Sequence, residues 1–241
     1  MFSRKLTRSI VVGASAIAVA GGSYGIVSAT SSSGTAAAST TPAASSSSAA
    51  AGQGSGGGGS NARSGPAAGG ASGTVGSVST SKFTMTTSAG QQVTVDEASS
   101  TTYQKGTSPA SASALTTGKP VLVLGTTNGT TITATQVIVQ PAGGGGSAAS
   151  SAAKVIPFQR GAPATSKQVG QIPASYSQGS GAIVSGTTAN KAAEAALAAY
   201  PGGIVDRVVK LSNGEYEVHY IGVNWPHHVF VNQDFKVVGA E

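Results

Sequence analysis

Between residues 73 and 140, apolar positions alternate with Thr, Ser and other polar positions in short runs. The runs are GTVGSVS, KFTMTT, QQVTVDE, KPVLVLG and TITATQVIVQ. A period of two with many β-branched residues is typical of half-buried strands. Asn128-Gly129 predicts a type I′ hairpin turn, and TSAGQQ around Gly90 predicts a second hairpin. We therefore expect about five strands that form a small β-barrel.

A helical period replaces this alternation in TTANKAAEAALAAYPGG, residues 187–203. Its alanines favour a helix, Thr187 or Thr188 can cap its start, and Pro201-Gly202-Gly203 ends it. One narrow apolar face of this helix comprises Ala189, Ala193, Leu197 and Tyr200. We expect that face to pack on a flat sheet.

The next stretch, IVDRVVKLSNGEYEVHYIGV at residues 204–223, predicts a β-hairpin that turns at Asn213-Gly214. A two-residue loop would place Lys210 opposite Glu217 and Val208 opposite His219. The face under the helix would then bury Val209, Leu211, Tyr216, Val218 and Tyr220. The solvent face would carry Asp206, Lys210, Glu215, Glu217 and His219.

Three histidines are present in the whole chain: His219, His227 and His228. Adjacent strand residues point to opposite faces, so at most one of His227 and His228 can face His219. We favour the interpretation that all three are ordinary strand residues, with no metal or other cofactor. The alternative is a zinc or copper site formed by His219 with His227 or His228, to which Glu215 or Glu217 would add a carboxylate.

The stretch after the hairpin contains the single tryptophan. Trp225, beside Pro226, is expected to pack over the end of the sheet, or alternatively to serve as an exposed anchor for a partner. Tyr220 and Phe230 join Trp225 as candidate residues for binding a protein partner. Asn232-Gln233-Asp234 predicts a turn before a last strand, FKVVGA.

The other segments are interpreted from their composition. Residues 1–29 have basic residues, then an apolar run, then Val27-Ser28-Ala29, and predict a signal peptide or, if uncleaved, a membrane anchor. Residues 30–72 are Ser, Ala and Gly-rich and predict a disordered tether. Residues 141–186 predict a second, semi-ordered linker, and a solvated segment is favoured over a docked one.

Charge and cysteine content narrow the possible functions. The formal net charge is +6, but Arg4, Lys5 and Arg8 lie in the N-terminal segment, and the remainder is too small to indicate nucleic-acid binding. Cysteine is absent, which excludes disulfides, thiolate metal sites and a cysteine nucleophile. No G-x-S-x-G motif is present. These features favour a protein that is not an enzyme.

The block GTVGSVSTSKFTMTTSAGQQVTVDEASSTTYQKG, with LTTGKPVLVLG and TITATQVIVQ, resembles an uncharacterised family of small OB-like β-barrel domains in exported bacterial proteins. The resemblance covers residues 73–140 and implies a fold rather than an activity. OB barrels bind single-stranded nucleic acids by stacking bases on aromatic residues. Phe83 and Tyr103 are the only aromatic residues of this block, so we expect no nucleic-acid binding.

The stretch ANKAAEAALAAYPGGIVDRVVKLSNGEYEVHYIGV, followed by HHVFVNQDFKVVG, resembles the PepSY domain. The resemblance covers residues 187–241, and Phe235 stands where that family often has glycine. It implies a binding module, for which a role in regulating peptidases has been proposed. We therefore expect a mainly β protein with an OB-like barrel and an α+β C-terminal module, joined by disordered linkers. Its expected function is non-catalytic binding of a peptidase or another envelope component outside the cytoplasm.

Overall fold

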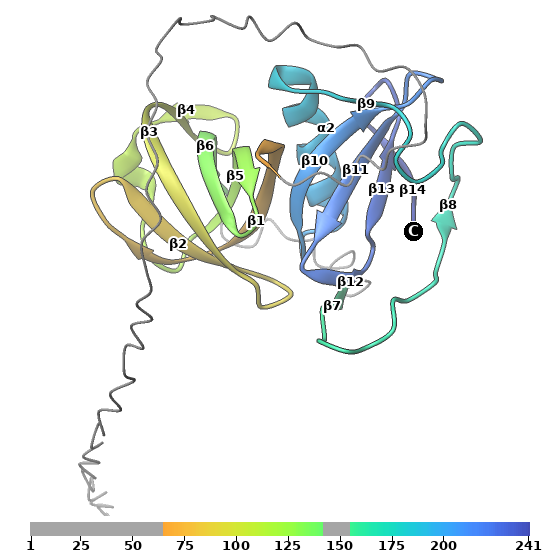
Figure 1. The fold of residues 1–241 in the computed structure, drawn as a ribbon. Coiled ribbons are helices and arrows are strands. Elements are labelled where there is room, and N and C mark those ends of the chain that lie inside the picture. Colours follow the sequence, from red (N-terminus) through yellow and green to blue (C-terminus); the bar gives the residue numbers. More distant parts are fainter. Residues whose placement is uncertain (1–64, 142–154) are drawn as a thin grey trace, which may run out of the picture. The chain divides into compact units, whose positions relative to one another are not determined.

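The computed structural model describes residues 65–141 and 155–241 (Figure 1). The predicted signal segment, most of the predicted tether and the first part of the predicted linker lie outside these residues. Within the described residues the protein is mainly β, as the alternating pattern predicts. No helix among them has the length and apolar character needed to cross a membrane.

The N-terminal part of the structure is a ring of paired strands. Its elements are β1 (Ala67–Val78), β2 (Lys82–Thr87), β3 (Gln92–Lys105), β4 (Ser108–Ala110), the short 3-10 helix η1 (Ala112–Ala114), β5 (Pro120–Asn128) and β6 (Thr131–Val139). Pairing runs from β1 through β2, β3, β6 and β5 back to β1, and β3 and β6 are parallel. Apolar side chains fill the ring, among them Val75, Phe83, Val95, Val123 and Ile132.

The turns of this ring follow the sequence in part. The hairpin around Gly90, which has a φ of 84°, is confirmed between β2 and β3. The type I′ turn at Asn128-Gly129 is wrong, because Asn128 pairs with Thr131 and only Gly129 has a positive φ. The ring also begins before the predicted boundary at residue 73, since residues 67–72 belong to β1 and pair with β5.

The C-terminal part combines α2 with a sheet. Its elements are α2 (Gly186–Ala199), β10 (Ile204–Lys210), β11 (Tyr216–Ile221), β12 (Val223–Trp225), β13 (His228–Val231) and β14 (Val237–Ala240). The helix begins after Ser185 rather than at a threonine cap, and it ends before Pro201. The expected apolar stripe is confirmed, because all four of its residues are buried in one cluster with Val205, Val218 and Trp225.

The predicted register of the hairpin is wrong by one residue. The amide of Leu211 donates to the carbonyl of Glu215, so the loop has three residues, and Gly214 has a φ of 85°. Lys210 therefore pairs with Tyr216, and Val209 pairs with Glu217. A three-residue loop that ends in a left-handed glycine is a common hairpin form, and the sequence does not distinguish it from a two-residue turn.

Because of this register, the two faces of the sheet differ from the expected ones. Tyr216, Val218 and Tyr220 lie on the helix side, as predicted. A one-residue slip transfers every side chain of the other strand to the opposite face. Val209 therefore shares the far face with Glu217 and Phe230, to which it is aligned across the strands.

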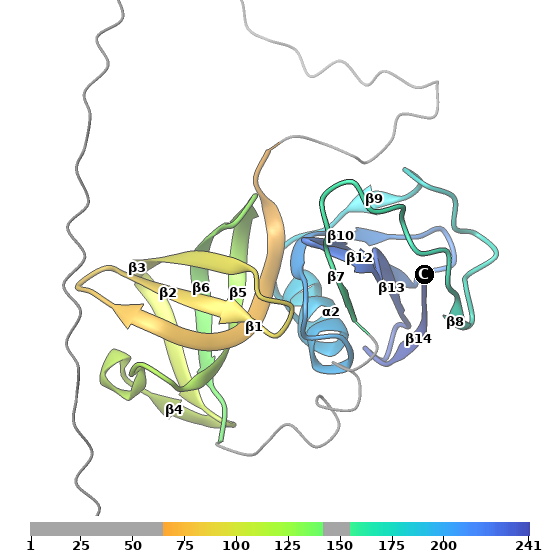
Figure 2. The same ribbon diagram turned by 90° about the horizontal axis from the view of Figure 1, so that it is seen from below.

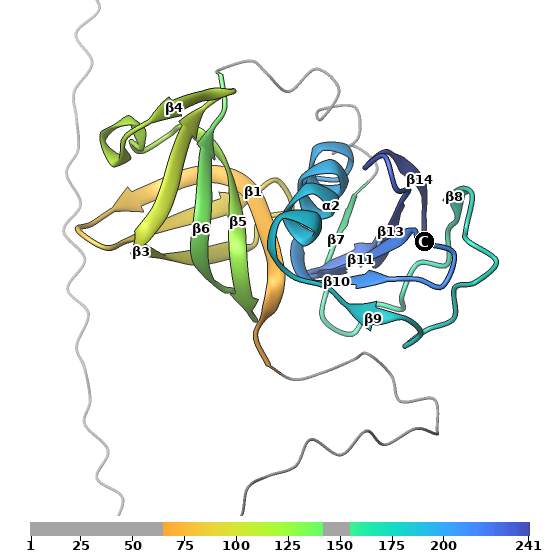
Figure 3. The same ribbon diagram turned by 90° about the horizontal axis from the view of Figure 1, so that it is seen from above.

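Residues 155–185, which we call the strap, run along the sheet, and Tyr176 of the strap lies over the far face, where its ring packs on Phe230. The strap carries three short strands: β7 (Ile156–Pro157), β8 (Val169–Gly170) and β9 (Ala182–Ile183). They pair with β12, β14 and β10 respectively. Figures 2 and 3 show β9 beside β10, on the side of the sheet away from α2. This part of the predicted linker is therefore docked rather than solvated.

The turn before the last strand agrees with the sequence. The side chain of Asn232 accepts hydrogen bonds from the amides of Asp234 and Lys236, which closes the turn. Phe235 has a φ of 57°, a left-handed conformation that explains why a glycine would suit this position. One further pairing, of Gly70 and Ala71 in β1 with Val205 and Ile204 in β10, joins the ring and the C-terminal sheet.

Candidate functional site

His219 in β11 and His228 in β13 stand directly opposite each other on the far face of the sheet. The backbone N–H and C=O of His228 both bond to Glu241, on the side of β13 that faces away from β11. His219 and His228 are therefore paired without backbone hydrogen bonds between them. Such pairs have the closest side chains in an antiparallel sheet. The centroids of the two imidazole rings are 5.1 Å apart.

A β-bulge brings His227 to the same side. The backbone N–H groups of His227 and His228 both donate to the carbonyl of Glu241, at 2.8 Å and 3.0 Å. Two successive residues thus oppose one, which interrupts the alternation of side chains. The expectation that at most one of His227 and His228 can face His219 is therefore wrong.

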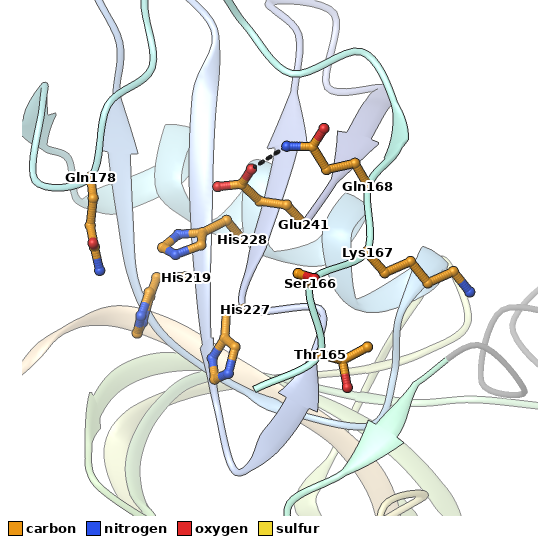
Figure 4. Close-up of a pocket in the computed structure, with 9 residues that line it drawn as sticks. All are labelled: Thr165, Ser166, Lys167, Gln168, Gln178, His219, His227, His228 and Glu241. Atoms are coloured by element: carbon orange, nitrogen blue, oxygen red, sulfur yellow. Dashed lines mark hydrogen bonds between the residues drawn. The ribbon is translucent and has the colours of Figure 1, made fainter. Parts of the chain in front are cut away.

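All three imidazoles line one cavity of about 640 Å³, which we call the histidine pocket (Figure 4). The other six residues around it are polar or charged. The full lining is Thr165, Ser166, Lys167, Gln168, Gln178, His219, His227, His228 and Glu241. The three histidines of the chain, nine positions apart at most in sequence, thus meet four consecutive residues of the strap.

A second bulge supplies a partner for His219. Val205 pairs with Tyr220 and Arg207 pairs with His219, so Asp206 is the extra residue of β10. Oδ1 of Asp206 lies 2.5 Å from Nδ1 of His219, and Oδ2 lies 3.4 Å from the guanidinium of Arg207. Arg207 is itself buried, so the carboxylate of Asp206 is held between an imidazole and a fixed cation.

Glu217 is the corresponding partner of His228. Its Oε1 lies 2.7 Å from Nδ1 of His228, and its side chain is 3% exposed. The side chains of His219 and His228 are 17% and 12% exposed. The prediction that Glu217 and His219 lie on a solvent face is therefore wrong, because the strap covers this face. Glu215 remains near the surface, where it bonds to Asn213.

These contacts determine which ring nitrogen of His219 and of His228 carries the hydrogen. An ionised carboxylate can only accept a hydrogen bond, so Nδ1 of each imidazole carries the hydrogen. In the neutral imidazole, Nε2 then keeps its lone pair. Each ring is thus oriented by a carboxylate on one side and has a free electron pair on the other.

Burial favours the neutral form of the third imidazole, His227. Burial lowers the pKa of His227 below its usual value of 6.5, and the positive forms of His219 and His228 lower it further, against an opposing hydrogen bond with the backbone of Tyr220. His227 therefore has an available lone pair at neutral pH.

The strap closes over the pocket through Tyr176. The ring of Tyr176 packs on Phe230 at 4.7 Å and on His228 at 5.5 Å between centroids. Burial, then the charges of Glu217 and Glu241, raise the pKa of the Tyr176 phenol well above 10, and its hydroxyl bonds to Glu241. The carboxylate of Glu241 also accepts a bond from Gln168 at 3.2 Å. Tyr176 and Gln168 thus tie the strap to the wall of the pocket.

The residues expected to contact a protein partner are in the interior. Trp225, Tyr220 and Phe230 are each 0% exposed. Trp225 packs over the sheet end as expected, and its indole N–H donates to the carbonyl of Lys167 at 2.6 Å. These three side chains have no surface to offer a partner while the strap is docked.

The sequence argument missed Asp206, Glu241 and Tyr176 as members of the site. Glu241 lines the histidine pocket, Asp206 contacts His219 from a bulge in β10, and Tyr176 contacts His228 from a segment without periodic pattern. No family model, curated protein or solved structure matches the chain. The function is therefore inferred from this geometry.

Proposed function

We propose that the histidine pocket binds a transition-metal ion, zinc or copper. One observation carries this proposal: two imidazoles face each other, and each is held at Nδ1 by a carboxylate. Metal-ligating histidines almost always donate their other ring N–H to such a partner, which fixes the ring and strengthens Nε2 as a ligand. His219 and His228 are the ligands, and Asp206 and Glu217 are their supports.

The spacing of the two rings agrees with coordination to one ion. Zinc–nitrogen bonds of about 2.0–2.1 Å in a tetrahedral arrangement place the centroids of two imidazoles about 5 Å apart. The observed separation of His219 and His228 is 5.1 Å. The separation of the two rings is therefore compatible with coordination to one ion.

A third ligand requires a local adjustment. In the described part of the chain, no three His, Asp or Glu side chains are arranged to hold a metal ion as they stand. The ring of His227 lies 6.5 Å from that of His228, and its neutral form can coordinate. Rotation of the His227 side chain toward the His219–His228 pair completes a three-histidine site, and water fills the remaining position.

The charges around the pocket also suit a cation. Asp206, Glu217 and Glu241 contribute three carboxylates, and Arg207 and Lys167 are the permanent cations beside them. An imidazole binds a metal ion in its neutral form, which adds no positive charge. A bound divalent ion therefore balances negative charge that is already present.

We propose that the protein with this site is exported, as the sequence resemblances imply. We propose that residues 73–140 are an OB-like barrel, which the ring of five strands with β3 parallel to β6 supports. We propose that residues 187–241 are PepSY-like, which the packing of α2 on a short antiparallel sheet supports. With the N-terminal signal segment, they describe a non-catalytic protein outside the cytoplasm.

We propose metal binding ahead of the function expected from the sequence, which is binding of a peptidase or envelope component. That expectation comes from the PepSY resemblance, and its candidate contact residues Trp225, Tyr220 and Phe230 are buried.

Calorimetric titration of the exported chain with zinc chloride and with copper(II) chloride tests the proposal. We expect one ion per chain, and His219→Gln and His228→Gln each to weaken binding by about 100-fold or more, a larger loss than that for a supporting residue. Asp234→Asn, at an exposed turn outside the pocket, is the control and should bind as the parent does. Heats equal to dilution, or equal affinities for all four proteins, would refute metal binding.

A further inference from the structure

Three side chains of the strap make contacts at or beside the histidine pocket. Tyr176 packs on His228, Gln168 bonds to Glu241, and Lys167 lies over the ring of Trp225 with Nζ 4.8 Å from the centroid. His228 is a proposed metal ligand. The position of the strap and the geometry of the metal site therefore depend on the same side chains.

The strap pairs with the rest of the structure through short strands, and its Ile156, Val169 and Val184 pack against an apolar core. Each of its strands, β7, β8 and β9, has two residues. Beside β8, the amide of Gln171 donates to the carbonyl of Val238 at 2.9 Å. Segments with few backbone hydrogen bonds open more easily than the strands of a core.

Apolar surface lies beneath the strap. Phe230 is fully buried, yet it is a member of neither of the two apolar clusters that form the cores. Its aromatic neighbour is Tyr176 of the strap. Opening of the strap would therefore expose Phe230 and loosen the ring of His228 at the same time.

We infer that the docked strap and an ion in the histidine pocket stabilise each other, so that occupancy of the metal site controls whether the far face of the sheet is covered. This inference rests on the proposed function and adds its regulation. An ion bound at Nε2 fixes the ring of His228, on which Tyr176 packs. Coupling between two equilibria is reciprocal, so strap docking strengthens ion binding by the same factor by which the ion strengthens docking.

Hydrogen exchange of the full chain, with and without saturating zinc, measures this coupling. We expect zinc to slow exchange of the Gln171 amide by about 10-fold or more, a coupling of ordinary size. Amides of β6, which lies in the ring of strands, should not change. Unchanged exchange at Gln171 in a chain that binds zinc would overturn the inference and leave the proposed function intact.

A pair of glycine variants tests the reciprocal effect. Gly170 in β8 has a φ of +72°, and a Cβ there would lie 2.2 Å from the carbonyl oxygen of Val238 in β14. Gly161, also in the strap, has a φ of +81° and open space around it. Both Gly→Ala changes strain the backbone, but only Gly170→Ala pushes the strap from the sheet. We expect Gly170→Ala to weaken zinc binding about 10-fold and Gly161→Ala to leave it unchanged.

Tyr176→Ala provides an independent variant that leaves the backbone alone. It should weaken zinc binding and raise exchange at Gln171 in the zinc-loaded chain, because the contact with His228 is lost. Equal zinc affinity in the parent, Gly170→Ala and Tyr176→Ala proteins would overturn the inference. Absence of zinc binding to the parent would overturn the proposed function as well.

Discussion

Nδ1 of His219 lies 2.5 Å from Oδ1 of Asp206, although the two residues are thirteen positions apart and sit on neighbouring strands. Asp206 reaches His219 because it is the extra residue in a bulge of β10. A regular strand would turn every second side chain away from this face. The bulge at Asp206 in β10 and the bulge at His227 thus bring the carboxylates and imidazoles together.

Asp206→Asn should weaken zinc binding by about 10- to 100-fold, the usual loss when the partner of a ligating histidine is changed. The amide has nearly the shape of the carboxylate, but it lacks the charge that strengthens Nε2 of His219. Calorimetric titration measures the change. The matched control is Asp234→Asn, which removes an exposed carboxylate far along the chain from β10. If both variants bind zinc equally well, Asp206 does not support a metal ligand.

Without metal, His227 should make the fold sensitive to mild acid. Its pKa is lower in the folded protein than the usual 6.5, mainly because of burial. The unfolded chain therefore takes up the proton first as the pH falls below about 6.5, and folding stability is lost. Between about pH 7.5 and about pH 5, the free energy of unfolding should decrease less in His227→Gln than in the parent protein. Urea denaturation with a chelator present measures it, and identical pH profiles would contradict the lowered pKa.

The elements that depend on local pattern were predictable from sequence. The alternation in residues 73–140 marks β strands, and the alanine-rich stripe through Leu197 marks the buried face of α2. Each of these signals is contained within a few residues. The mainly β class and the helix-on-sheet packing follow from them.

The candidate site was predictable only in its residue types. The three histidines and Glu217 stood out in the sequence, but their arrangement depends on a three-residue loop at Gly214 and on two bulges. A bulge shifts the register by one residue without a pattern that marks it. Docking of the strap depends on a long-range contact between Tyr176 and Phe230, which no periodicity indicates.

Phe230→Ala should destabilise the protein by about 3–5 kcal/mol, because truncation of a fully buried aromatic side chain leaves a cavity. Val78→Ala, at a side chain that is 44% exposed, is the control and should change stability by about 0.5 kcal/mol or less. Chemical denaturation of both variants measures the difference. Equal stabilities would mean that Phe230 is at the surface in solution, as an anchor for a partner would be.

Gly214→Ala should cost about 1–2 kcal/mol, since residues other than glycine are strained in the left-handed conformation that ends this loop. Ser212→Ala, in the same loop and exposed, serves as the control. Thermal denaturation compares the two. A two-residue turn at Asn213-Gly214 would instead make Asn213→Ala as damaging as Gly214→Ala, and that result would contradict the observed register.

X-ray absorption spectroscopy of the zinc-loaded chain is the sharpest test of metal binding by His219 and His228, because it identifies the atoms bound to the ion. We expect two or three imidazole nitrogens at about 2.0–2.1 Å from the zinc ion, and fewer in the His219→Gln and His228→Gln proteins. A first shell of oxygen atoms alone, with no imidazole scattering, would contradict it.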